Sequence, residues 1–208
     1  MDIIKVCEAV PPDLQALKDK LRELVRYSSV TRLQFHTGSS EIETSEMDAS
    51  FKPGRILSNN MVFILVSGDA MRLTFKVHFN TRTAKKLSFS IFGGNSAENI
   101  SEKQAIDYFK EYGNLVAGSV ISLMDKSQIE LGISLPLCTR GFYEVFSDYT
   151  EKQHPITTYS DFWNLNVGSH SVCCSAQYEI LDRKQLAKLI DLEITEDEID
   201  DDGEMEFL

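Results

Sequence analysis

Three polar side chains, Asp107, Glu111 and Asn114, are the residues of this chain whose types and spacing could do chemistry. They lie four and three residues apart, so in a helix their side chains share one stripe. The segment 101–125 also carries apolar residues at helical intervals on the opposite stripe, which predicts a helix that lies on a core and turns the acid and the amide outward. The apolar residues are Ile106, Phe109, Val116, Val120 and Leu123.

The chemistry open to this stripe is the positioning of another molecule. An exposed glutamate and an amide form neither a metal cage nor a nucleophile of the usual kind, and an amide has no useful pKa. The arrangement therefore suits a helix that docks into another protein's active site and completes it. Asp107 and Glu111 repel each other mildly, with partial relief from Lys103 and Lys110, and a local rule broken on an exposed face hints at function. The alternative is an ordinary solvated helix face.

The segment from Asp107 to Gly118 resembles the signature helix of the CheC/CheX/FliY family of chemotaxis phosphatases, which reads Asp or Ser, three residues, Glu, two residues, Asn. Downstream, Ile133-Ser134-Leu135-Pro136 with Gly141 close behind is similar to the Ile-Ser-x-Pro and trailing Gly that follow this helix in CheX-type domains. The motif match covers residues 107–141, and the rest of the chain is compatible in pattern only.

This resemblance implies a phosphatase that acts on a phospho-aspartyl receiver domain such as CheY. Asn114 is expected to enter the receiver pocket and orient the attacking water, and Glu111 to pair with a receiver lysine. Asp107 takes a supporting role. No cofactor of its own is implied, because the receiver brings the Mg²⁺ to its acyl phosphate. The first predicted helix, with Asp13, Lys18 and Glu23, has no Glu-x-x-Asn, so the resemblance is to CheX-like members with a single site.

The competing function is a binding module without catalysis, because the same fold occurs in flagellar switch components. Asn114 discriminates between the two, since a pure binder has no need of an amide three residues after the glutamate.

The negative charge of the chain is concentrated at its end. The 208 residues have a formal net charge of -11, and ten of the acids, with no base, lie between Asp191 and Leu208. We therefore expect residues 1–192 to form a CheX-like phosphatase domain and residues 193–208 a disordered acidic tail. Nucleic acid is disfavoured as a partner, because the chain has no basic stripe with interleaved aromatic residues.

Hydrophobic periodicity along the chain predicts an α+β fold in which two or three helices pack on one mostly antiparallel sheet. Helices are expected from Asp13 to about Tyr27, over 101–125 and over 183–190, and residues 37–58 should form a long loop or an exposed hairpin. Strands are expected over 30–36, 61–66, 72–79, 87–91, 129–135 and 172–180, with 72–79 half-buried and Trp163 in the core.

Several other sites are disfavoured by spacing. His36, His78, His154 and His170 show no metal-ligand pattern, and Gly93-Gly94-Asn95-Ser96 is a turn rather than a phosphate-binding loop. Cysteines 7, 138, 173 and 174 form no C-x-x-C pair, and no serine or cysteine nucleophile arrangement can be argued. With no export signal and no long apolar run, a reduced cytoplasmic setting is expected, without membrane insertion; a homodimer is left open.

Overall fold

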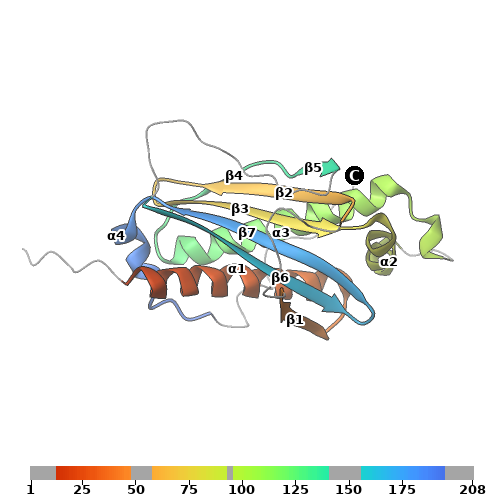
Figure 1. Ribbon diagram of the computed structural model, residues 1–208, viewed down its shortest axis with the longest axis horizontal. Helices are drawn as coiled ribbons and strands as arrows, with labels where there is room; N and C mark the ends of the chain where they lie inside the picture. Colours follow the sequence, from red (N-terminus) through yellow and green to blue (C-terminus); the bar gives the residue numbers. More distant parts are fainter. Residues whose placement is uncertain (1–12, 48–57, 93–95, 141–155, 195–208) are drawn as a thin grey trace, which may run out of the picture.

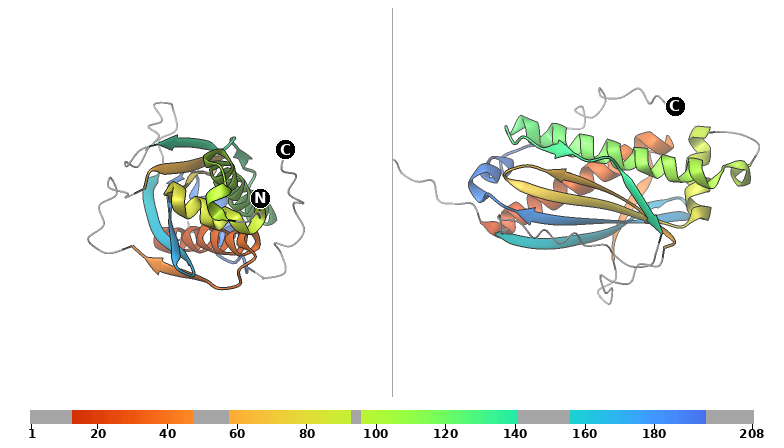
Figure 2. Two further views of the ribbon diagram at one scale, coloured as in Figure 1. Left: turned by 90° about the vertical axis from the view of Figure 1, so that its right-hand side faces the viewer. Right: turned by 90° about the horizontal axis from the view of Figure 1, so that it is seen from above.

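The computed structural model describes residues 13–47, 58–92, 96–140 and 156–194. The described residues form two layers, with one sheet on one side and the helices on the other (Figures 1 and 2). The α+β class predicted from the sequence is confirmed. None of the helices in these ranges is both long enough and apolar enough to cross a membrane.

Three longer helices and a short one make up the helical layer. A 3₁₀ turn, Ala97–Asn99, precedes the third helix, and another, Ala187–Leu189, follows the fourth. The helices are α1 (Leu14–Thr37), α2 (Thr81–Phe92), α3 (Glu102–Lys126) and α4 (Arg183–Leu186).

The sheet has seven antiparallel strands in the order β1-β6-β7-β3-β2-β4, and β5 also pairs with β2. The strands are β1 (Ile42–Glu46), β2 (Asn60–Ser67), β3 (Met71–Phe79), β4 (Gly132–Ile133), β5 (Leu137–Arg140), β6 (Thr157–Val167) and β7 (His170–Ile180). The central pair is β3 and β7, where Phe75 lies opposite Ala176.

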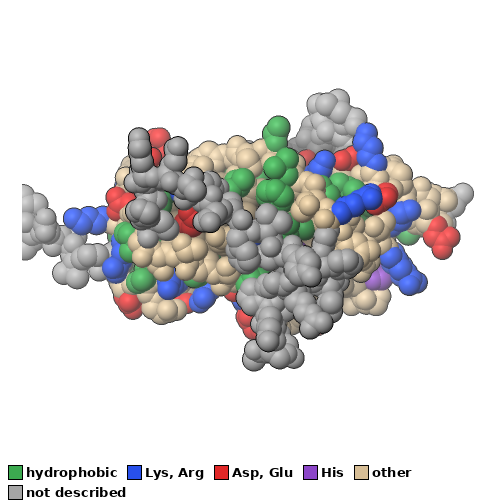
Figure 3. All heavy atoms as spheres, turned by 45° about the horizontal axis from the view of Figure 1, so that its top comes forward, with side chains coloured by type: hydrophobic (Ala, Val, Ile, Leu, Met, Phe, Trp, Pro, Cys, Tyr) green, Lys and Arg blue, Asp and Glu red, His purple; other side chains and the backbone are tan. Residues whose placement is uncertain are grey.

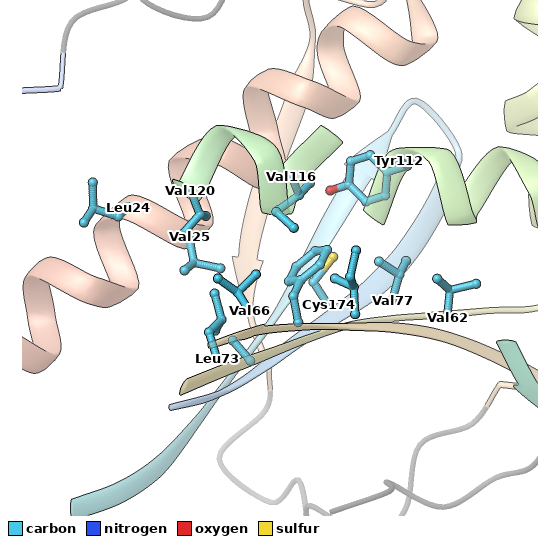
Figure 4. Packing of buried hydrophobic residues seen from close by; sticks show 14 of the residues in the cluster. Leu24, Val25, Val62, Val66, Leu73, Val77, Tyr112, Val116, Val120 and Cys174 are labelled. Atoms are coloured by element: carbon cyan, nitrogen blue, oxygen red, sulfur yellow. The ribbon is translucent and has the colours of Figure 1, made fainter. Parts of the chain in front are cut away.

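The core lies between the two layers. Figure 4 shows Tyr112, Val116 and Val120 of α3 and Val25 of α1 lying over the sheet residues Val62, Val66, Leu73, Val77 and Cys174, and all of these are buried. Phe79 stacks on Phe109 with ring centroids 4.1 Å apart. Trp163 is fully buried, as predicted. The burial of this apolar face orients α3, because its apolar stripe can be removed from water only against the sheet.

The element order repeats within the chain. A long helix, an edge strand, a hairpin and a helix (α1, β1, β2–β3, α2) are followed by a second long helix, edge segment, hairpin and short helix (α3, β4–β5, β6–β7, α4). Each edge segment pairs with the hairpin of the other half, because β1 lies on β6 whereas β4 and β5 lie on β2. The two halves therefore complete each other's sheet.

Two segments predicted as strands are helical. The strand expected over 30–36 is wrong, because α1 continues to Thr37 and ends at Gly38, whose φ of 67° stops the helix. The strand expected over 87–91 is also wrong. Asn80 accepts a hydrogen bond from the backbone N–H of Thr83 at the start of α2, and Ala84, Leu87 and Ser88 are buried at helical spacing.

The strand predictions needed four further corrections. Residues 42–46, placed in a loop or hairpin, form β1 on the edge of the sheet. Residues 72–79 are buried on both faces except for Arg72, rather than half-buried. The strand expected over 129–135 is reduced to β4, with β5 following Pro136, and β6 was not predicted. The strands expected over 61–66 and 172–180 and the helices over 101–125 and 183–190 are confirmed, with the last helix tightening to 3₁₀ at Ala187.

The end of the described chain leads to a prediction about the acidic tail, which lies outside the described residues from position 195 onward. Leu192 and Ile194 pack against the core, so a stop codon placed after Ile194 keeps every side chain of the described residues that packs there. We expect this truncation to leave the melting temperature unchanged, because so acidic a run gains little from burial. Calorimetry of the full and shortened chains tests it, and a Tm several degrees lower would mean that Ile199, Met205 or Phe207 docks on the body.

Candidate functional site

The candidate site lies on α3, whose start is fixed by a capping box. The Ser101 hydroxyl accepts a hydrogen bond from the Gln104 backbone N–H at 3.1 Å, and Gln104 Oε1 accepts one from the Ser101 backbone N–H at 3.0 Å. Two donors that would otherwise lack partners at the helix end are thereby satisfied. The capping box predicted from the sequence is confirmed, and it sets the phase of the helix just before Asp107.

Contacts with α1 hold the rotation of α3. The Tyr112 hydroxyl donates to the backbone oxygen of Ser29 at 2.8 Å, and the Ser119 hydroxyl donates to the Ser28 hydroxyl oxygen at 3.2 Å. Burial raises the pKa of Tyr112 well above its usual value, so the phenol remains a neutral donor. Tyr112 directly follows Glu111, and its fixed position therefore fixes the side of the helix on which the glutamate lies.

A second anchor, His36 of α1, lies beside the start of the site. Its Nε2 is 3.1 Å from the backbone oxygen of Tyr108, and the two rings lie 4.2 Å apart. Burial lowers the pKa of His36 to about 4, so the ring is neutral at pH 7 and can donate one hydrogen bond from Nε2. Tyr108 directly follows Asp107, so both acidic residues of the stripe are placed by buried tyrosines.

The three predicted site residues lie together on the outer side of α3. Asn114 Nδ2 donates a long hydrogen bond to Glu111 Oε2 at 3.4 Å, and both side chains are half-exposed. Asp107 is 45% exposed and has Lys110 Nζ at 3.9 Å from its Oδ1. The acid and the amide are thus adjacent and accessible, on a helix whose opposite side is immobilised in the core.

Two glycines of the motif are not required by packing within the described chain. A Cβ placed on Gly113 would meet Val62 Cγ1 at an ordinary 3.6 Å, and one on Gly118 would meet nothing within 4 Å. Gly118 is exposed one turn beyond Asn114 on the same side of α3. Its lack of a side chain leaves the surface beside Asn114 open to close approach by a partner.

The downstream Ser-x-Pro segment has a structural role. Ser134 Oγ accepts a hydrogen bond from the Leu65 backbone N–H at 3.0 Å, and the Ser134 backbone N–H donates to Leu65 O at 2.9 Å. Ser134 therefore continues the pairing with β2 between β4 and β5, where Pro136 interrupts the edge. Gly141 lies outside the described residues.

Other chemistry-bearing residues serve the fold. Among the described ranges, no three His, Cys, Asp or Glu side chains gather in a group that could hold a metal ion. His78 is buried, rather than solvated, with its Nε2 3.0 Å from Ser175 Oγ. Cys173 and Cys174 point to opposite faces of β7, and of the two only Cys174 is fully buried.

Helix α1 carries a copy of the site's spacing that sequence inspection missed. The spacing of four and three residues that separates Asp107, Glu111 and Asn114 also separates Asp19, Glu23 and Arg26. The buried residues near these positions of α1 match buried residues at the same positions of α3. These matched pairs are Leu21 with Phe109, Leu24 with Tyr112, Val25 with Gly113, and Ser28 with Val116.

In this copy, an arginine replaces the amide. Arg26 Nε and Nη2 donate to the two carboxylate oxygens of Asp161 on β6, both at 2.7 Å, and Arg26 also pairs with Glu46 on β1. The guanidinium is thereby used to hold α1 to the sheet, and α1 offers no amide for positioning water. The prediction that only one helix carries Glu-x-x-Asn agrees with this arrangement.

The comparisons with known proteins point in one direction. Residues 61–156 match the family model of the chemotaxis phosphatase CheX, and this span contains α3 with Asp107, Glu111 and Asn114. No curated protein matches the chain.

Solved structures with the same fold include a CheC-like superfamily protein from Shewanella sp. PV-4, with a TM-score of 0.59, 14% identity, and coverage of 77% of this chain and 97% of that one. The chemotaxis protein CheX from Vibrio vulnificus gives a TM-score of 0.56 at 14% identity, covering 75% of this chain and 97% of that one.

A third similar structure comes from a CheX–CheY–BeF₃–Mg²⁺ complex of Borrelia burgdorferi, with a TM-score of 0.55, 13% identity, and coverage of 77% of this chain and 97% of that one. At these identities the likeness concerns the fold, whereas the family model concerns the sequence. The segment 61–156 is thus similar to the chemotaxis phosphatase CheX, and the chain shares its fold with CheC-like and CheX proteins, in agreement with the resemblance of the α3 motif.

Proposed function

We propose that this protein dephosphorylates the phospho-aspartyl group of a CheY-like receiver by inserting the outer face of α3 into the receiver's active site. The observation that carries the proposal is the adjacent, half-exposed pair of Glu111 and Asn114 on a rigidly packed helix. The CheX–CheY complex from Borrelia burgdorferi supports the choice of partner, because a protein of the same fold is there assembled with CheY.

Asn114 supplies the chemical step by orienting water. A water molecule attacks the phosphorus in line with the acyl oxygen, the bond from phosphorus to the aspartyl oxygen breaks, and free carboxylate and inorganic phosphate result. The hydrogen bond from Asn114 Nδ2 to Glu111 leaves the amide oxygen to accept a hydrogen bond from the attacking water. Fixing the water in this way lowers the entropic cost of the attack.

Glu111 and Asp107 set the pose of the helix. Glu111 pairs with a receiver lysine across the interface, which fixes the register of α3 in the pocket. Asp107 supports this pose of α3 from the edge of the same stripe. This chain contributes no cofactor to the reaction, since the Mg²⁺ belongs to the receiver and neutralises charge on its phosphoryl group.

The direct test mixes the protein with acyl-phosphorylated CheY-like receivers and follows phosphate loss against the receiver alone. We expect faster loss with at least one receiver. Tight binding without any acceleration would instead identify a non-catalytic receiver-binding module.

A charge reversal separates docking from turnover. Glu111→Lys should weaken complex formation, because the new ammonium would face the receiver lysine, and like charges placed together across an interface cost several kcal/mol. Titration of a receiver carrying beryllofluoride measures this affinity. Glu130→Lys is the matched control, since Glu130 is exposed in the turn after α3. Equal affinities for the parent and the Glu111 variant would contradict the pose.

A further inference from the structure

A groove of about 490 Å³ runs between α3 and β5, beside the candidate site. Its described lining comes from two elements that are separated in the sequence by β4. From α3 come Glu102, Lys103, Ile106, Asp107 and Lys110, and from β5 come Cys138 and Arg140. Because Asp107 belongs both to this groove and to the stripe that carries Glu111 and Asn114, the groove is a direct extension of the site.

The lining of the groove contains both apolar and charged side chains. Ile106 and Cys138 are half-buried and supply apolar surface, whereas Lys103 is exposed. Arg140 Nη2 donates to Glu102 Oε1 at 2.7 Å and thereby ties β5 to the first turn of α3. Figure 3 shows basic, acidic and hydrophobic side chains lying close together on this side of the molecule.

The internal repeat provides a built-in comparison for this groove. Beside α1, the arginines reach across to the sheet, because Arg26 pairs with Asp161 and Glu46, and Arg22 Nε lies 3.9 Å from Asp161. Arg22 has the same place in the repeat as Lys110 of α3. Lys110 instead lies 3.9 Å from Asp107 of its own helix and lines the groove.

We infer that the groove between α3 and β5 holds the rim of the phosphorylated receiver next to its acyl phosphate, an inference that rests on the proposed phosphatase function. The rim must lie over this groove when α3 enters the pocket, because Asp107 borders both. A pocket that binds Mg²⁺ beside a phosphorylated aspartate has an anionic rim, which Lys103 and Lys110 complement, while Ile106 and Cys138 take up an apolar receiver side chain.

Cys138 provides a probe inside the groove. In a Cys7→Ser/Cys173→Ser variant, the fully buried Cys174 stays protected and Cys138 is the thiol to be labelled. Burial raises the pKa of Cys138, so labelling with a maleimide is done at mildly alkaline pH. Saturating receiver with beryllofluoride should slow this labelling at least tenfold, on the order of the exclusion expected inside a closely packed interface.

The label can also be used to block the groove, so that its effect on receiver binding is measured. A bulky maleimide on Cys138 should raise the KM for phosphorylated receiver, whereas the same reagent should not change the KM of a Cys138→Ser variant relative to that variant before treatment. Lys110→Glu should raise KM about tenfold at low salt and less at high salt, because charges at the rim of an interface act mainly on association. Lys184→Glu, an exposed lysine on α4, is the matched control and should leave KM unchanged.

The outcomes separate this inference from the proposed function. If no receiver is bound or dephosphorylated, the proposed function fails. If turnover depends on Asn114 while bound receiver leaves Cys138 labelling unchanged, the function stands and the groove inference is overturned. Protection that grows with protein concentration in the absence of receiver would assign the groove to a second copy of this chain and would likewise overturn it.

Discussion

Asn114→Ala should lower the rate constant for receiver dephosphorylation by about 100-fold, the usual loss when one positioned polar group is removed from a transition state. Its side chain donates the 3.4 Å hydrogen bond to Glu111, and Asn114 is not among the residues of the hydrophobic core. The melting temperature and the affinity for beryllofluoride-activated receiver should therefore stay close to the parent's. Single-turnover loss of the acyl phosphate at saturating phosphatase measures the effect.

Asp125→Ala is the matched control for this substitution. Asp125 lies further along the exposed side of α3, so its removal also shortens a polar side chain on the same helix without touching the core. If Asn114→Ala kept the parental rate constant on a receiver that the parent dephosphorylates, the water-positioning mechanism would be wrong.

The second large effect concerns stability. Arg26→Met should destabilise the fold by about 3 kcal/mol, because it leaves the Asp161 carboxylate, whose side chain is only 8% exposed, without its main partner. At about 2–4 °C per kcal/mol for a chain of this size, the melting temperature should fall by roughly 6–12 °C. The value lies at the low end for broken buried pairs, because Arg26 itself is 24% exposed. Calorimetry or urea unfolding gives the free energy.

Arg26, Asp161 and Glu46 form an ion-pair clamp between α1 and the sheet, and Glu46 is its more exposed acid. Glu46 is 73% exposed, so Glu46→Gln should cost less than about 1 kcal/mol. Adding Asp161→Asn to Arg26→Met should recover part of the loss by removing the stranded charge. Below the transition, all these variants should retain the parental phosphatase rate, since the clamp lies on α1. Equal destabilisation by Arg26→Met and Glu46→Gln would refute the clamp.

The arrangement of the candidate residues on α3 was predictable from the sequence because its determinants are local. The Ser101–Gln104 capping box, the apolar spacing of α3 and the spacing of Glu111 and Asn114 all lie within one helix, and each has its expected position. The groove beside it was not predictable, because Cys138 and Arg140 approach α3 only through the pairing of β5 with β2. No local signal in the sequence reports a pairing between segments so far apart.

Two of the wrong element predictions, those for α1 and β6, share one physical cause, which is the burial of polar residues. α1 was shortened because its inner side changes from leucines to Ser28, Ser29 and His36, which pair with α3 and with Trp163 instead of packing as apolar groups. β6 was missed because Asp161 occupies a buried inward position, where it accepts hydrogen bonds from Arg26. Periodicity methods expect apolar residues at such places.

A different pattern misled the prediction for α2. Leu87, Phe89 and Ile91 alternate with serines, as a strand would, yet Asn80 caps a helix whose buried positions are Ala84, Leu87 and Ser88. Here the cap at the start of the segment outweighed the alternation within it.

The exchange of edge strands between the halves makes the chain a single mechanical and folding unit. Strand β1 follows α1 in the chain but pairs with the second hairpin, whereas β4 and β5 follow α3 but pair with the first hairpin. If either half were absent, the hairpin of the other half would lack its edge strand. Contacts that join distant parts of a chain must close large loops before they stabilise anything, which slows folding. A newly synthesised first half would thus expose the outer edge of β2, which β4 and β5 cover in the complete fold, until α3 and its edge segment emerge.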